Sequence, residues 1–187
     1  NWGVAVRDFA TGETLIVNPD EHFVAGSLYK LGVAAETYAR ISEGALSEQS
    51  FVVIGPQDVA PEYGGSRDPE GTYLTVHQAL VAMVTVSDNG AALAMVDRLG
   101  LNAVNNRFEQ LGMPNTRLVY DSETTPRDLM SYFTLLADGE LISPEVSDTL
   151  LELLAAQQIN DRIPAGLPAG EDWWVAHKTG NVDAMLG

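Results

Sequence analysis

Segments with strand character lie at the two ends of this chain, and the long middle part has the pattern of helices. Residues 2–8 alternate apolar with polar side chains and residues 14–17 are apolar or β-branched, so they predict a β-hairpin. Residues 173–180 have strand character again. Because strands must pair to satisfy their backbone groups, the two ends are expected to meet in one sheet. Helical spacing of apolar residues predicts helices over 27–41, 75–86, 91–99, 103–111, 126–137 and 144–157.

This pattern predicts an α+β architecture with two lobes. Residues 1–26 and 160–187 are expected to form a lobe built on an antiparallel sheet, and residues 27–159 a mainly helical lobe. A chain of 187 residues can bury roughly 70% of the surface that its unfolded form exposes, so its core needs neither disulfides nor metal. The complete lack of cysteine is compatible with this and excludes thiol catalysis and cysteine-bound zinc or iron–sulfur sites.

The charge of the chain makes two classes of partner unfavourable. The sequence has 26 Asp and Glu against 10 Lys and Arg, a formal net charge of −16 that would repel a nucleic-acid backbone or an anionic membrane surface. No run of about 18 apolar residues occurs, so no membrane span is predicted. The histidines lack the spacing of metal ligands and are interpreted as structural or solvated: His22, His77 and His177.

The chain has two lysines, Lys30 and Lys178, and each lies in a short motif that could belong to an active site. Lys30 follows Ser27 by three residues at the start of a predicted helix, and side chains at this spacing share a helix face. A serine hydroxyl needs an adjacent base to become a good nucleophile, and a lysine within one turn can serve as that base. Alone the pattern S-x-x-K is weak evidence, because it arises by chance in roughly a third of chains of this length.

Two further motifs strengthen this interpretation. The run Ser87-Asp88-Asn89 falls between two predicted helices, and Lys178-Thr179-Gly180 ends the last predicted strand. Each has a chance expectation of roughly 2% in such a chain, and S-x-x-K, S-D-N and K-T-G together are a known signature of penicillin-recognising enzymes. The chain therefore resembles the class A β-lactamases and the penicillin-binding DD-peptidases, and the resemblance runs from Trp2 to the end.

The resemblance implies the role of each motif residue. Ser27 would be the nucleophile, Lys30 would help to deprotonate it, and Ser87 would relay a proton to the leaving nitrogen. The residues expected to bind substrate are Asn89 for a side-chain amide, Lys178 and Thr179 for a carboxylate, and Gly180 and Asn181 for close backbone approach, with the N–H groups of Ser27 and Asn181 as the oxyanion hole. Tyr63 would form the aromatic wall of the site or be a surface tyrosine. No cofactor is implied.

The sequence departs from the class A pattern in the loop that supplies the deacylating base. The family motif E-x-x-L-N does not occur, and the segment between Thr116 and Thr124 contains Asp121 and Glu123 as its only acids. Glu123 is a possible base, although the connection is short. Without a base aimed at the hydrolytic water, the acyl-enzyme is expected to accumulate.

The end of the sequence is also shorter than in the family, in which two more strands and a helix follow K-T-G. We expect these elements to be missing from this chain. The sequence leaves open whether residues near Asp121, including the loop glutamate, are missing as well. The hypotheses are a β-lactamase, a D-Ala-D-Ala carboxypeptidase or transpeptidase relative that turns over slowly, and a non-enzymatic β-lactam sensor or cell-wall binding module. The partner is a β-lactam or a D-Ala-D-Ala peptide, and the family resemblance implies a secreted or cell-envelope location. The sequence leaves the oligomeric state open.

Overall fold

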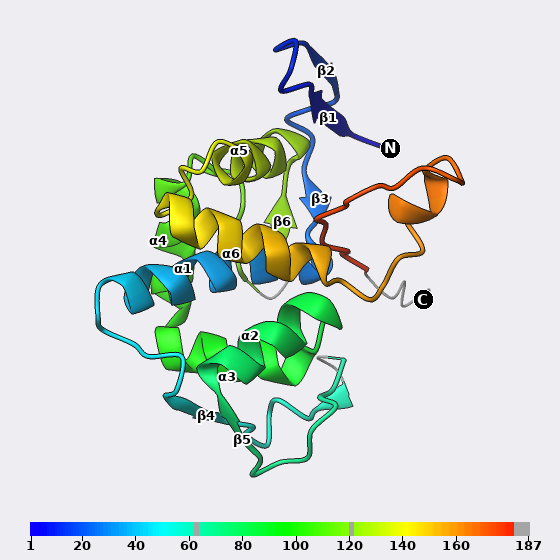
Figure 1. Cartoon of the computed structure of the whole chain (residues 1–187). Coiled ribbons are helices and arrows are strands. Elements are labelled where there is room, and N and C mark those ends of the chain that lie inside the picture. The colour runs from blue at the N-terminus through cyan, green and yellow to red at the C-terminus, as the bar shows by residue number, and fades with distance from the viewer. Residues whose placement is uncertain (62–63, 120–121, 182–187) are drawn as a thin grey trace.

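The computed structural model describes residues 1–61, 64–119 and 122–181, and Figure 1 shows their arrangement. A single-turn 3₁₀ helix at Gly26–Tyr29 leads directly into α1. The α-helices are α1 (Lys30–Ser42), α2 (Val76–Thr85), α3 (Asn89–Leu99), α4 (Leu101–Gln110), α5 (Pro126–Ala137) and α6 (Pro144–Ala155). The strands are β1 (Val4–Arg7), β2 (Thr14–Val17), β3 (Phe23–Val24), β4 (Phe51–Val53), β5 (Tyr73–Thr75) and β6 (Glu123–Thr124). A second 3₁₀ turn spans Pro164–Gly166.

The predicted helices are confirmed, and polar side chains cap the first turn of four of them. Thr75 forms a reciprocal capping box with Gln78 at the start of α2. Asp88, Thr125 and Ser143 accept a backbone N–H at the starts of α3, α5 and α6. Such a cap is typically worth about 1 kcal/mol because it satisfies a backbone donor that the helix itself leaves open.

Helix α1 lies at the centre of the helical part and packs against α2, α3 and α4 (Figure 1). Most of its side chains are buried, including the apolar run from Leu31 to Ala35. A Cβ on Gly32 would lie 2.3 Å from the ring of Phe108, so only glycine allows α4 to approach so closely. The tightly packed surroundings hold the Lys30 end of α1 in one position.

The strands differ from the single sheet that the sequence predicts. Within the described residues they form three separate antiparallel pairs, β1 with β2, β3 with β6 and β4 with β5. The terminal hairpin is confirmed, with Val4 opposite Val17. The other two pairs were not predicted, because strands of two or three residues are too short to show a periodicity of two.

The predicted strand over 173–180 is wrong for the part of the chain that the structure describes. Residues 173–181 have no strand pairing there, and the backbone N–H of His177 bonds the carbonyl oxygen of Leu154 at the end of α6 instead (3.2 Å). A residue adopts strand structure only when a neighbouring strand accepts its backbone groups. Trp173 and Trp174 are both exposed.

No helix within the described ranges is both long and apolar enough to cross a lipid bilayer. The division into two lobes, 1–26 with 160–187 and 27–159, stays a prediction.

Candidate active site

Ser27 and Lys30 lie on successive turns of the same helical segment, as their spacing predicts. Ser27 is in the 3₁₀ turn and Lys30 is the first residue of α1. Their side chains meet, with Lys30 Nζ 3.0 Å from Ser27 Oγ. A potential nucleophile and a potential base are therefore in hydrogen-bond contact.

The amine of Lys30 is fully buried and surrounded by oxygen atoms. Besides Ser27 Oγ, it contacts the carbonyl oxygen of Ser87 (2.7 Å), Ser87 Oγ (3.2 Å) and Asn89 Oδ1 (2.5 Å). An ammonium has three protons, so one of these four oxygens faces the nitrogen without a hydrogen. Once Lys30 loses a proton, its lone pair can accept the hydroxyl proton of Ser27.

The environment favours this neutral form. Burial, together with the nearby positive charge of Lys178, lowers the pKa of Lys30 to about 7, and the carboxylate of Asp88 acts in the opposite direction. Near neutral pH a large fraction of the molecules therefore carries a free amine beside Ser27.

The turn between α2 and α3 presents Ser87 to this amine in an unusual backbone conformation. Ser87 has a φ of 58°, a region that residues other than glycine rarely adopt. The neighbouring Asp88 anchors the turn, because its carboxylate accepts the backbone N–H groups of Arg67 and Ala91, both at 2.8 Å. Asp88 thus directs both the carbonyl and the hydroxyl of Ser87 towards Lys30.

Lys178 reaches the same serine from the other end of the sequence. Its Nζ lies 2.9 Å from Ser87 Oγ and donates to the carbonyl oxygen of Thr179 (2.9 Å). Burial lowers its pKa to about 8. Thr179 is also largely buried. The three motifs, from positions 27–30, 87–89 and 178–180, therefore converge.

Two glycines let the last segment approach the nucleophile closely. A Cβ on Gly180 would lie 2.7 Å from the carbonyl oxygen of Ala25, and a Cβ on Gly26 would lie 2.8 Å from that of Asn181. Gly26 also has a φ of 49°. The backbone of Asn181 therefore runs beside the residue that precedes Ser27.

Contacts on either side of Lys178 attach this segment to the loop after α6. His177 Nε2 lies 2.9 Å from Asn160 Oδ1, and the guanidinium of Arg162 donates to Asn181 Oδ1 (3.1 Å). Sequence analysis missed Asn160 and Arg162 because no motif marks them. A polar run directly after a predicted helix was the only signal.

The remaining predicted site residues are placed as follows. Asn89 turns its Nδ2 towards Gly64, which leaves no room for a Cβ there. Glu123 is exposed, and its Oε2 lies 3.3 Å from His22 Nδ1. Tyr63 and Asp121 lie outside the described residues.

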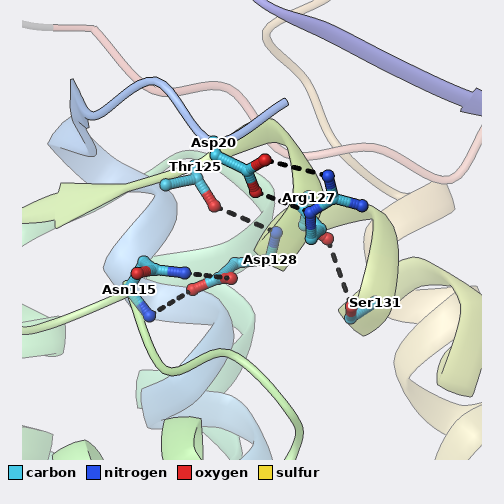
Figure 2. Close-up of polar contacts among 6 residues, drawn as sticks. All are labelled: Asp20, Asn115, Thr125, Arg127, Asp128 and Ser131. Atoms are coloured by element: carbon cyan, nitrogen blue, oxygen red, sulfur yellow. Dashed lines mark hydrogen bonds and ion pairs between the residues drawn. The ribbon is translucent and has the colours of Figure 1, made fainter. Parts of the chain in front are cut away.

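The start of α5 holds a polar cluster, where sequence analysis predicted only the beginning of the helix over 126–137 (Figure 2). The buried carboxylate of Asp128 accepts the backbone N–H of Asn115 (2.8 Å), its side-chain amide (3.3 Å) and the hydroxyl of Thr116 (2.8 Å). On the surface, Arg127 binds both carboxylate oxygens of Asp20 (2.6 and 2.9 Å). These bonds join the loop before β6 and the N-terminal segment to α5.

Comparison with known proteins identifies the family of the chain. The whole chain, residues 1–187, matches the model of the Beta-lactamase enzyme family. The chain belongs to this family. It is 30% identical over 200 residues to a β-lactamase of Streptomyces albus G, in an alignment that covers 95% of this chain and 63% of that protein. The chain thus spans less than two thirds of this relative's length.

Solved structures identify the fold. An ancestral class A β-lactamase (GNCA) matches with a TM-score of 0.85 and 30% identity, over 95% of this chain and 74% of that one. A mutant of PBP-A, solved as an acyl-enzyme complex with penicillin G, matches with a TM-score of 0.87 and 29% identity, over 96% and 70% of the two chains. The α+β, class A β-lactamase-like fold that the motifs predicted is confirmed.

Proposed function

We propose that the protein is a serine hydrolase of the β-lactamase type, in which Ser27 opens a β-lactam ring and becomes acylated. The observation that carries this proposal is the position of Lys30 Nζ, 3.0 Å from Ser27 Oγ and 3.2 Å from Ser87 Oγ. One amine can thus take a proton from the nucleophile and pass it on towards a leaving group. Membership of the β-lactamase family supports the same assignment.

Acylation would proceed in two proton-coupled steps. Ser27 Oγ forms a bond to the carbonyl carbon of the ring, and its proton moves to the neutral amine of Lys30. The C–N bond of the ring then breaks, and the nitrogen takes the proton of the Ser87 hydroxyl while Lys30 returns a proton to Ser87. The product is an ester on Ser27 with Lys30 neutral again.

The other motif residues would bind the substrate. The backbone N–H groups of Ser27 and Asn181 would stabilise the oxyanion that develops on the carbonyl oxygen. Lys178, which carries most of its positive charge below its pKa of about 8, would attract the substrate carboxylate together with Thr179. Asn89 would hold the substrate's side-chain amide, although its Oδ1 is already bonded to Lys30.

A slow-turnover relative of the DD-peptidases is the second candidate. It is favoured by the position of Glu123, whose exposed carboxylate contacts His22. A carboxylate engaged there is a poor base for water at an ester on Ser27. Such a protein would be acylated by β-lactams or D-Ala-D-Ala peptides and would release the product slowly. A sensor that stays acylated is the limiting case.

Intact-mass spectrometry after incubation with penicillin G tests the proposal. We expect a mass increase equal to one penicillin, which disappears in Ser27→Ala. The matched control Ser47→Ala removes an exposed serine distant in sequence from the motifs and should retain the adduct. No mass increase in the wild type, or an increase that survives in Ser27→Ala, would refute the assignment.

A further inference from the structure

Two side chains of the loop after α6 form hydrogen bonds with the segment around Lys178. Asn160 and Arg162, two residues apart, bind His177 and Asn181, which flank Lys178 on either side. The backbone N–H of His177 adds a third bond, to Leu154 at the end of α6. We call these three contacts the α6 clamp.

The clamp replaces a strand ladder in the described part of the chain, where residues 173–181 pair with no strand. His177 is its central member, because it is bonded through both its backbone and its side chain and is only 7% exposed. Asn181 and Arg162, by contrast, are exposed. The position of this segment relative to α6 therefore depends mainly on His177.

We propose that His177 is a positioning residue, which holds the Lys178 ammonium at Ser87 through its bonds to Asn160 and Leu154 and so orients the carboxylate of an incoming β-lactam. The proposal rests on the acylation chemistry proposed above. His177 and Lys178 are adjacent in the chain, so fixing the backbone and imidazole of His177 against the end of α6 and its loop limits where the Lys178 side chain can lie. In the structure the Lys178 Nζ lies 2.9 Å from Ser87 Oγ.

The charge state of His177 agrees with this role. Burial, together with the nearby Lys178, lowers the pKa of His177. At neutral pH the ring is therefore uncharged and has one N–H to give, which Asn160 Oδ1 can accept from Nε2. A neutral ring holds the segment without placing a further positive charge beside the two lysines.

The test compares penicillin G with its methyl ester, which lacks the carboxylate. In His177→Phe we expect the second-order rate constant of acylation by penicillin G to fall about tenfold, the effect of one lost hydrogen bond at the upper end of its range. The rate with the ester should fall less, because the ester has no carboxylate for Lys178 to bind and feels only the effect of Lys178 on the pKa of Lys30. His177→Gln, which retains an N–H donor, should recover part of the rate. Asn160→Ala removes the acceptor and leaves His177 in place, so it should show the same selectivity.

Two controls separate positioning from a general loss of structure. His77→Phe makes the same chemical change at an exposed site on α2 and should leave both rates unchanged. In a Lys178→Ala background, His177→Phe should have no further effect on the rate with penicillin G, since its proposed action passes through Lys178.

The outcomes are distinguishable from failure of the proposed function. A wild-type protein that forms no adduct overturns the acylation chemistry itself. A wild-type protein that is acylated, with His177→Phe and Asn160→Ala slowing both substrates equally or neither, overturns the positioning role alone.

Discussion

Lys30 and Lys178 share one acceptor, since their Nζ atoms lie 3.2 and 2.9 Å from the same Ser87 Oγ. Burial lowers the pKa of both, and the charge of Lys178 further lowers that of Lys30, to about 7 against about 8 for Lys178. As the pH rises, Lys30 therefore loses its proton first. The order of these two pKa values favours Lys30 as the proposed base and Lys178 as the group that keeps its positive charge.

This order predicts a bell-shaped pH profile for acylation. The rate should rise as Lys30 is deprotonated near pH 7 and fall as Lys178 is deprotonated near pH 8. In Lys178→Ala the rising limb should move to higher pH, because loss of a neighbouring cation raises the pKa of Lys30. The measurement is the acylation rate constant of a chromogenic cephalosporin from pH 5 to 10. A rising limb at the same pH in both proteins would contradict the electrostatic coupling.

Replacing Lys178 should weaken acylation according to the charge that remains. Lys178→Ala should lower the acylation rate constant by about 10- to 100-fold, the typical effect of one hydrogen bond to a charged group. Lys178→Arg keeps the charge but changes its geometry, so its loss should be smaller. Stopped-flow measurement of adduct formation tests this. Equal, wild-type rates in both variants would make Lys178 a structural residue.

Turnover should be slow relative to acylation. With Glu123 engaged by His22 and no E-x-x-L-N motif in the sequence, we expect a burst of one ring opening per molecule followed by a low steady rate. Stopped-flow with a chromogenic cephalosporin shows both phases. Sustained fast turnover would refute this expectation. If Glu123→Gln then abolished the turnover, Glu123 would be the base, and His22→Gln serves as the control for simple loss of the surface contact.

The polar cluster at the start of α5 should matter for stability. Asp128→Ala leaves the partly buried backbone N–H of Asn115 and the buried hydroxyl of Thr116 without the carboxylate that accepts their hydrogen bonds, which should lower the free energy of unfolding by about 2–4 kcal/mol. Asp20→Ala removes only the exposed partner of Arg127 and should cost far less. Urea denaturation compares the two variants. A similar loss of stability in both variants would show that the contribution of Asp128 to the free energy of unfolding does not depend on its burial.

The sequence was most informative where local patterns decide the structure. Helical periodicity located the helices, and the spacing of Ser27 and Lys30 predicted that their side chains would meet, because both follow from the geometry of one helix. The clamp contacts of Asn160 and Arg162 could not be predicted in this way. They depend on how the end of α6 lies against a distant segment, and that arrangement is set by tertiary packing.

The failed strand prediction has the same origin. Residues 173–180 have strand-like composition, but composition carries no information on whether a neighbouring strand is available. Glu123 likewise has suitable chemistry for a base, whereas its contact with His22 follows from the pairing of β3 with β6.

Lys30 and Lys178 belong to parts of the molecule that differ in local stability. Lys30 lies on α1 in the packed core, whereas Lys178 lies on a segment attached by a few contacts. We expect this segment to open locally at a free energy well below that of global unfolding, with faster amide exchange at His177 than at Val33. On opening, water and the loss of a neighbouring cation would return Lys30 to its charged form. A charged Lys30 could not take the proton of Ser27, although the helices would remain folded. On heating, the protein would therefore lose activity at a lower temperature than that of global unfolding.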